Sequence, residues 1–232
     1  MITNYKQDEK FSRVYYEILQ KDGVIDQISK RIAELNDHAH DETIEVHQPE
    51  LQKVGIDALV FTVSVSDGSS DKFSADYKFL RKGDPNQATV EILSNVERKV
   101  PGWISGKRMD YVVYVHMADG KVVIAPYREL EEAWERTEKE WEEEYKTFEA
   151  QTGYGNGKRA YHTRCIKIPY DVLFAAMRLD LAQHTLDFKP SQSLLNLLKS
   201  FKIKTRIEKT PNEKAAELAA YEAFARRKEL HE

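Results

Sequence analysis

An acidic and a basic side chain two positions apart, Asp76 and Lys78, have types and spacing suited to joint chemistry. They lie in a segment whose alternation predicts a β-strand, and the period of two places both on one face of that strand. Ala75, Tyr77 and Phe79 then face the opposite side. A carboxylate and an ammonium group therefore share one surface, where the ammonium could orient a water molecule or stabilise negative charge developing on a phosphate.

A second carboxylate, Asp57, stands at the beginning of the preceding predicted strand. A hairpin between the two strands could bring it beside Asp76, and two converging carboxylates repel each other unless a positive charge lies between them. Hard divalent cations are held by one or two carboxylates together with waters and substrate phosphate oxygens. Glu91, one strand further along, could add a ligand or act as a general base. The pattern indicates a site for Mg²⁺, with Mn²⁺ as an alternative.

These residues need a sheet to position them. Segments rich in β-branched and aromatic residues, separated by turn-rich sequence, predict five strands over 59–65, 73–80, 88–93, 111–117 and 122–124. Residues 164–168 can form one more strand, and apolar residues at helical spacing predict helices over 10–35, 127–150 and 170–183. We expect an α/β (mixed α+β) fold with a central mixed sheet of about five strands flanked by helices. His38-Ala39-His40 is expected to be an exposed loop.

The composition changes near the end of the chain. After Lys189-Pro190 the sequence is first amphipathic, then polar and basic, and finally rich in Ala, Glu, Lys and Arg. We therefore expect a globular domain over residues 1–185 and an appended basic, partly helical C-terminal tail over residues 186–232.

The order of these residues resembles the PD-(D/E)xK nuclease superfamily. Its signature is an aspartate at a strand start, followed on the next strand by an acidic residue, any residue and a lysine; here eighteen residues separate Asp57 from Asp76-Tyr77-Lys78. The wider succession is similar to nuclease-like proteins of phages and mobile elements over about residues 50–135, through Gly55-Ile56-Asp57, Val90-Glu91-Ile92-Leu93-Ser94, Pro101-Gly102-Trp103-Ile104 and the segment 110–115.

The resemblance implies a restriction-endonuclease-like domain that cuts DNA with Mg²⁺, as an endonuclease or an exonuclease. By this resemblance Asp57 and Asp76 would be metal ligands and Lys78 the catalytic lysine, while Glu91 would assist as a further ligand or base. Ile56 departs from the family pattern, which has a proline before the first aspartate, and Asp76 is the less common acidic choice.

Two other interpretations of the same residues stay open. A second alignment makes Asp76 the first carboxylate and Glu91 the second, but Leu93 then stands where lysine belongs and the site lacks its cation. A solvated strand face would also explain Asp76 and Lys78 without chemistry. The alternative function is a catalytically inactive nuclease-fold protein that binds DNA or a host protein, as an accessory factor of a phage or mobile element.

The stretch from Lys78 to Arg108 is locally basic, which favours DNA as a partner although the formal net charge of the chain is -4. Trp103 could stack on a base or pack within its loop, and the loop Ser105-Gly106-Lys107-Arg108 could contact phosphates or be an ordinary basic loop. The candidates for nucleic-acid contact are Arg98, Lys99, Trp103, Lys107 and Arg108. The glutamate-rich segment 129–149 is most simply a solvated helix face; a third hypothesis makes it an acidic interaction module.

The composition excludes several classes of protein. A chain of 232 residues that is 41% hydrophobic and 32% charged is not collagen-like or mucin-like, and the single cysteine, Cys165, excludes a disulfide scaffold. The sequence contains no apolar run of the ~20 residues that would cross a membrane, and its first residues lack the apolar region of a secretory signal. We expect a cytoplasmic protein, in the host cytoplasm if phage-encoded, with a homodimer as one option for its assembly.

Overall fold

The computed structural model describes residues 3–46, 51, 56–81, 83–153 and 161–204. The chain divides into two compact units, Met1–Leu194 and Leu195–Glu232. The first unit contains both sheets and four of the helices described below. The helix α6 (Gln192–Lys204) runs across the division, and the Ala/Glu/Lys/Arg-rich end of the predicted tail lies outside the described residues.

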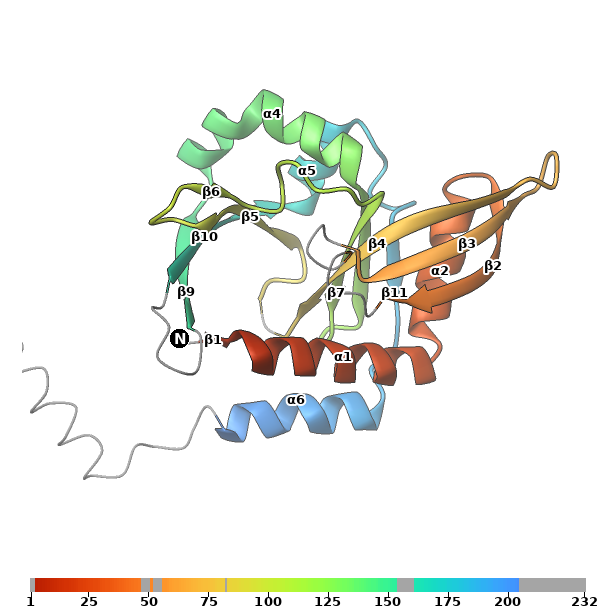
Figure 1. The fold of residues 1–232 in the computed structure, drawn as a ribbon, viewed down its shortest axis with the longest axis horizontal. Coiled ribbons are helices and arrows are strands. Elements are labelled where there is room, and N and C mark those ends of the chain that lie inside the picture. Colours follow the sequence, from red (N-terminus) through yellow and green to blue (C-terminus); the bar gives the residue numbers. More distant parts are fainter. Residues whose placement is uncertain (1–2, 47–50, 52–55, 82, 154–160, 205–232) are drawn as a thin grey trace, which may run out of the picture. The chain divides into compact units, whose positions relative to one another are not determined.

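The first sheet is mixed and has six strands in the order β11-β8-β7-β4-β3-β2 (Figure 1). Neighbouring strands are antiparallel except for β4 and β7, which are parallel. The strands are β2 (His38–Glu45), β3 (Ala58–Ser64), β4 (Ser70–Leu80), β7 (Tyr111–His116), β8 (Lys121–Pro126) and β11 (Thr185–Asp187). The domain boundary expected at residue 185 therefore falls inside β11.

The second sheet has five strands in the order β1-β9-β10-β5-β6. They are β1 (Thr3–Asn4), β5 (Gln87–Asn95), β6 (Val100–Pro101), β9 (Thr147–Gly153) and β10 (Tyr161–Pro169). The mixed α+β class is thus confirmed, and the first sheet is mixed with six strands where about five were expected. The strand predicted over 88–93 belongs to the second sheet instead. After β4 the chain leaves the first sheet, and β5 forms its hydrogen bonds with β10 and β6.

Helices cover the first sheet on both faces. On one side, α1 (Tyr5–Lys21) and α2 (Val24–Glu34) contact β4 and β2: the ring centroids of Tyr16 and Tyr77 are 5.6 Å apart, and those of Tyr15 and Phe79 are 6.0 Å apart. Gly23, at φ 73°, separates the two helices, in a left-handed conformation that glycine adopts without steric cost.

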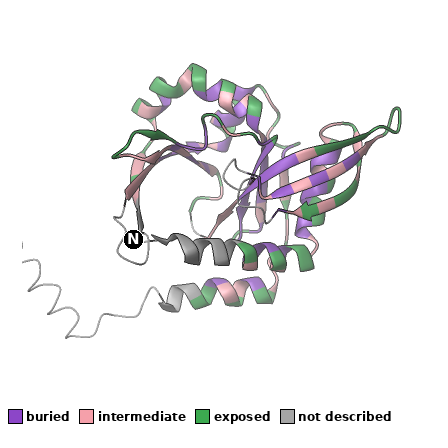
Figure 2. Ribbon diagram, in the orientation of Figure 1, coloured by how far each residue is buried: buried purple, intermediate pink, exposed green. Residues whose placement is uncertain are grey.

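The main hydrophobic core joins both sheets to α4 (Tyr127–Glu144) and α5 (Tyr170–Met177). Its fully buried members include Val90, Tyr114, Val123, Leu130, Ile166 and Phe174. Figure 2 shows the buried residues, in purple, along β4, β5 and β7. None of the helices among the described residues has the length and apolar character needed to cross a membrane.

Three local expectations were wrong. The helix predicted over 170–183 ends at Met177, where Arg178 takes a left-handed conformation. The helix predicted to reach residue 150 ends at Glu144, because Tyr145 takes an extended conformation and β9 begins two residues later. The spacing of Tyr145 and Phe148 fits a helix as well as a strand, so periodicity could not separate the two. His38-Ala39-His40 belongs to β2, where the His38 ring packs against Phe73.

Candidate functional site

The two faces of β4 meet different surroundings. Tyr77 and Phe79 face α1, whereas Asp76 and Lys78 lie on the opposite face, toward the side chains of Trp103 and Tyr114. Asp76 is only 5% exposed. A solvated strand face is therefore wrong as an explanation for this aspartate, and a charged group in this position requires a partner.

Asp57 is the residue just before β3, and its carboxylate contacts the backbone of β4. The Asp57 N–H donates to the carbonyl of Ala75 at 2.9 Å, and Asp57 Oδ2 accepts a hydrogen bond of 2.9 Å from the N–H of Tyr77. Burial raises the pKa of Asp57 to about 7, with further contributions from the charge of Asp76 and a side-chain hydrogen bond to it. Lys78 and the Tyr77 N–H act in the opposite direction. The two aspartates therefore lie side by side.

Lys78 supplies positive charge to this pair of carboxylates. Its Nζ is 2.5 Å from Asp76 Oδ2 and 5.1 Å from the centroid of the Trp103 ring. Burial alone would lower the pKa of Lys78, but the charges of Asp76, Asp57 and Glu91 outweigh burial and raise it. Lys78 is therefore a charged ammonium group at neutral pH.

Glu91 approaches the same place from β5, a strand of the other sheet. Burial raises its pKa, while Lys78, Lys107 and a hydrogen bond from the backbone N–H of Trp103 oppose that shift. These interactions place the Glu91 carboxylate within electrostatic reach of Lys78 and Asp76. Asp57, Asp76 and Lys78 thus lie together, and Glu91 is near enough from the second sheet to interact electrostatically with Lys78 and Asp76.

Gly102, for which no separate role was predicted, positions the loop that carries Trp103. The Gly102 N–H donates to the carbonyl of Ile92 at 2.8 Å, and a Cβ on Gly102 would lie 2.0 Å from the backbone oxygen of Glu91. Only glycine allows the chain to lie this close to β5. The close approach carries Trp103 to its place next to Lys78, and the only sequence signal was the segment Pro101-Gly102-Trp103.

Tyr127 also had no predicted role. Its hydroxyl lies 3.2 Å from the carbonyl oxygens of both Trp103 and Ile104, and it accepts a hydrogen bond of 3.1 Å from the N–H of Lys107. The first residue of α4 therefore holds the loop that carries Trp103 and Lys107. A tyrosine at a helix start gives no sequence signal for such contacts across the fold.

The two aspartates fit a hard divalent cation. Among the residues that the structure describes, no group of three or more His, Cys, Asp or Glu side chains is arranged to hold a metal ion. Asp57 and Asp76 are nevertheless two adjacent carboxylates, and Asp76 Oδ2 is enclosed beside Lys78. One or two carboxylates completed by waters and phosphate oxygens are a typical Mg²⁺ environment. A cation between them would also offset the repulsion from Asp76, which adds to the effect of burial on the pKa of Asp57.

Cys165 borders the site without being suited to chemistry. It is the cross-strand neighbour of Glu91, and burial followed by the charge of Glu91 raises the pKa of its thiol to about 12. The thiol is thus protonated at neutral pH, and only the thiolate is a strong nucleophile or ligand.

The five candidates for nucleic-acid contact lie in different environments. Trp103 is 7% exposed and packs in the core, its ring centroid 6.4 Å from that of Tyr114, so the predicted stacking on a base does not fit its burial. Lys107 is partly buried, and its charge acts to lower the pKa of Glu91. Arg108 is exposed. The backbone of the loop is engaged, because the Gly106 N–H donates to Glu131 Oε1 at 3.0 Å. The N–H groups of Gly106 and Lys107 are therefore engaged within the fold, and the side chains of this loop are the groups proposed to contact phosphates.

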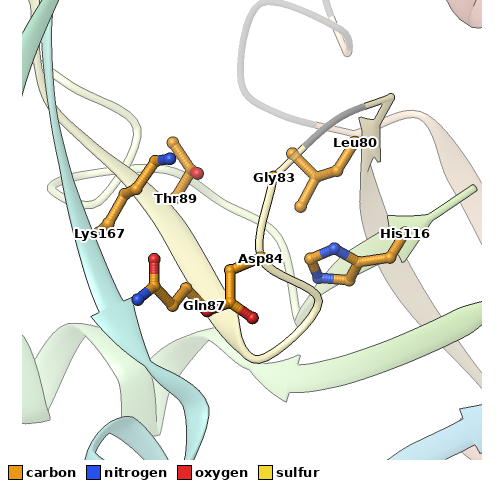
Figure 3. Close-up of a pocket in the computed structure, with 7 residues that line it drawn as sticks. All are labelled: Leu80, Gly83, Asp84, Gln87, Thr89, His116 and Lys167. Atoms are coloured by element: carbon orange, nitrogen blue, oxygen red, sulfur yellow. The ribbon is translucent and has the colours of Figure 1, made fainter. Parts of the chain in front are cut away.

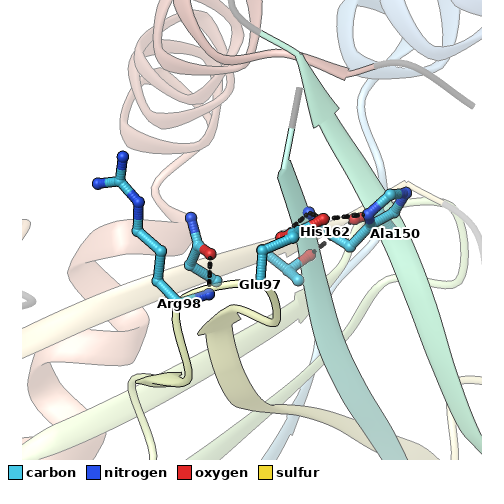
Figure 4. Close-up of polar contacts among 6 residues, drawn as sticks. Glu97, Arg98, Ala150 and His162 are labelled. Carbon is cyan, nitrogen blue, oxygen red and sulfur yellow. Dashed lines mark hydrogen bonds and ion pairs between the residues drawn. The ribbon is translucent and has the colours of Figure 1, made fainter. Parts of the chain in front are cut away.

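Arg98 and Lys99 lie in the turn between β5 and β6, where both are exposed. The preceding residue, Glu97, is bound to His162 of β10, with 2.5 Å between Glu97 Oε1 and His162 Nδ1, whereas the Arg98 side chain extends away from this pair (Figure 4). The structure thus brings Lys107 toward the carboxylates and leaves Arg98 and Lys99 at an exposed turn.

No family model, curated protein or solved structure matches this chain.

Proposed function

We propose that the protein is a Mg²⁺-dependent nuclease that hydrolyses phosphodiester bonds of DNA, as an endonuclease or an exonuclease, in the cytoplasm. The observation that carries this proposal is the grouping of Asp57, Asp76 and Lys78, with a pKa of about 7 for Asp57 beside a second carboxylate and with Glu91 in electrostatic reach. Buried like charges beside a charged lysine are costly in a fold and typical of a catalytic site.

Each side chain has a role that its environment supports. Asp57 and Asp76 would hold Mg²⁺, with Glu91 assisting, and bound Mg²⁺ supplies the charge that makes a water molecule a better nucleophile. Lys78, charged at neutral pH, would orient that water and stabilise the charge that develops on the phosphate oxygens. Glu91, whose pKa is raised, is suited to accept the proton that the water loses.

The arrangement of the strands supports a restriction-endonuclease-like domain as part of the proposal. Asp57 precedes one strand, and Asp76 and Lys78 share a face of its antiparallel neighbour, within a mixed sheet that has helices on both faces. The exposed cations Arg98, Lys99 and Arg108, with the partly buried Lys107, would attract the DNA backbone.

Cleavage of plasmid DNA in Mg²⁺ tests the proposal. Asp76→Asn keeps the shape of the side chain but removes a metal ligand, and we expect the rate to fall about a thousandfold or more. Asp71→Asn changes an exposed aspartate of the same strand and serves as the matched control, with the wild-type rate expected. A folded Asp76→Asn protein that cuts at the wild-type rate would disprove the proposed site.

One observation favours the alternative function, a nuclease-fold protein that binds DNA or a host protein without cleaving. The direct ion pair between Lys78 and Asp76 neutralises a carboxylate that a metal ion would need. This alternative predicts no cleavage of single-stranded, duplex or nicked DNA in Mg²⁺ or Mn²⁺, together with equal affinity for DNA in EDTA and in Mg²⁺.

A further inference from the structure

A pocket lies beside the candidate site, between the carboxyl ends of β4 and β7 and the pair of strands β5 and β10. Its walls include Leu80, Asp84, Gln87, Thr89, His116 and Lys167 (Figure 3). The enclosed space is about 30 Å³, and the empty space is about 250 Å³ when the part open to solvent is included, so a ligand larger than water would lie partly in the open part.

The pocket continues the site along the same strands. Leu80 follows Lys78 by two residues on β4, and Thr89 precedes Glu91 by two residues on β5. Two residues of a strand span ~7 Å and return to the same face. The neighbouring strands are shifted by the same two residues. On β10, Lys167 pairs with Thr89 and Cys165 pairs with Glu91, while on β7 His116 pairs with Leu80. A strand of nucleic acid held at the carboxylates would therefore have its adjoining nucleotide at the pocket.

The side chains around the pocket offer both donors and acceptors. Lys167, Thr89 and Gln87 can donate hydrogen bonds, and the Asp84 carboxylate can accept them. The His116 ring, 2% exposed, has its Nε2 2.8 Å from the Tyr170 hydroxyl. Burial lowers the pKa of His116, so that at neutral pH its ring carries one donor and one acceptor nitrogen.

This mixture fits a nucleobase better than a phosphate. A phosphate has acceptor oxygens only, and the carboxylate of Asp84 would repel it. A base presents donors and acceptors along its Watson–Crick edge and an apolar face, which Leu80 can contact. An exocyclic amino group, present on adenine, cytosine and guanine, could donate to Asp84, whereas thymine has no such group.

We propose that the pocket binds the unstacked base of the nucleotide next to the scissile phosphate, with a preference for bases that carry an exocyclic amino group. The inference rests on the proposed function for the position of the scissile phosphate. Because a base can enter the pocket only when it is unpaired, single-stranded or frayed DNA is the substrate class that the pocket selects.

Binding in EDTA tests the pocket without requiring cleavage. The probes are fluorescently labelled twelve-nucleotide strands of dA, of dT and of abasic nucleotides, with their affinities measured by anisotropy. For the wild-type protein we expect dA to bind more tightly than dT, and both to bind more tightly than the abasic strand. Thr89→Val and Gln87→Leu should each weaken dA binding about five- to tenfold and leave abasic binding unchanged.

Asp84→Asn should reduce the preference for dA over dT, and Gln27→Leu, an exposed glutamine of α2, is the matched control with no expected effect. Equal affinity of the wild-type protein for the dA and abasic strands, a measurement that needs no variant, would overturn the pocket proposal. So would duplex DNA that binds as tightly as a single strand through the same residues. If base-dependent binding holds but no DNA is cut, only the proposed function fails; cleavage without dependence on the base rejects only the pocket.

Discussion

Two carboxylates of this protein, Asp57 and Glu97, show opposite behaviour. Glu97 is exposed, accepts hydrogen bonds from the backbone and ring of His162, and these bonds lower its pKa to about 2. Asp57 is partly buried beside a second carboxylate, and its pKa rises to about 7. The first arrangement satisfies a charge at the surface, whereas the second holds like charges together at a cost to the fold. This difference is the reason for proposing Asp57 and its neighbours as the functional site.

The largest effect is expected from a substitution of Asp57, which removes the feature that distinguishes it from Glu97. Asp57→Asn removes one of two repelling charges, so we expect cleavage to fall about a thousandfold or more while the melting temperature at pH 8 rises. Initial rates in saturating Mg²⁺ and thermal unfolding measure the two effects. A loss of stability together with a normal cleavage rate would mean that Asp57 is a structural residue, like Glu97.

Gly102 tests whether close packing sets up the acidic cluster. With Cβ 2.0 Å from the Glu91 oxygen, Gly102→Ala should lower the free energy of unfolding by roughly 2–4 kcal/mol and reduce cleavage, because Glu91 and Trp103 must shift. Gly68→Ala is the control: no atom lies within 4 Å of its Cβ, and φ +72° alone should cost roughly 1–2 kcal/mol. Equal losses of stability in chemical denaturation would contradict the packing role of Gly102.

The pH dependence of metal binding sharpens the contrast between the two carboxylates. Since Asp57 is protonated below pH 7, Mg²⁺ must displace that proton, and its affinity should fall about tenfold for each pH unit below 7 and be constant above. Calorimetric titration of the wild-type protein with Mg²⁺, without DNA, measures this. A flat profile between pH 5 and 8 would show that Asp57 does not bind the metal.

Without metal, the raised pKa of Asp57 has a defined effect on stability. The native state binds the Asp57 proton more tightly than the unfolded state, so this contribution is greatest below pH ~4 and is lost as pH rises to about 7. Glu97 contributes in the opposite direction: its stabilisation is present above pH ~4 and is lost as pH falls toward about 2.

The smallest effect is expected at the exposed pair itself. Glu97→Gln should lower the melting temperature by about a degree or less and leave cleavage unchanged, because exposed ion pairs contribute little to stability. Differential scanning fluorimetry measures the melting temperature, and the plasmid assay measures cleavage. A large loss of cleavage would instead place the β5–β6 turn in the functional surface.

Much of the local structure was predictable from the sequence. The β-branched runs that form β3, β4, β7 and β8 were found to within a few residues, since such residues favour strands almost wherever they occur. The period of two placed Asp76 and Lys78 on one face of β4, and the hairpin to β3 explains why Asp57 lies beside them.

The rest depends on contacts between distant segments. Nothing within β5 specifies that it pairs with β10 more than seventy residues later, so its departure from the first sheet was not predictable from periodicity. The sequence left Trp103 free either to stack on a base or to pack within its loop, and the close approach of Gly102 to β5 buries it. Such outcomes are decided by tertiary packing, which local sequence patterns do not encode.

The position of Trp103 gives the protein an optical reporter. Its indole lies under the Lys78 ammonium, and indole fluorescence responds to a nearby cation. The chain has three tryptophans, and the other two, Trp134 and Trp141, lie together on α4 with ring centroids 6.2 Å apart. With both replaced by phenylalanine, the remaining emission would follow any event that moves Lys78, so that ion or substrate arrival could be timed in a stopped-flow instrument without an attached label.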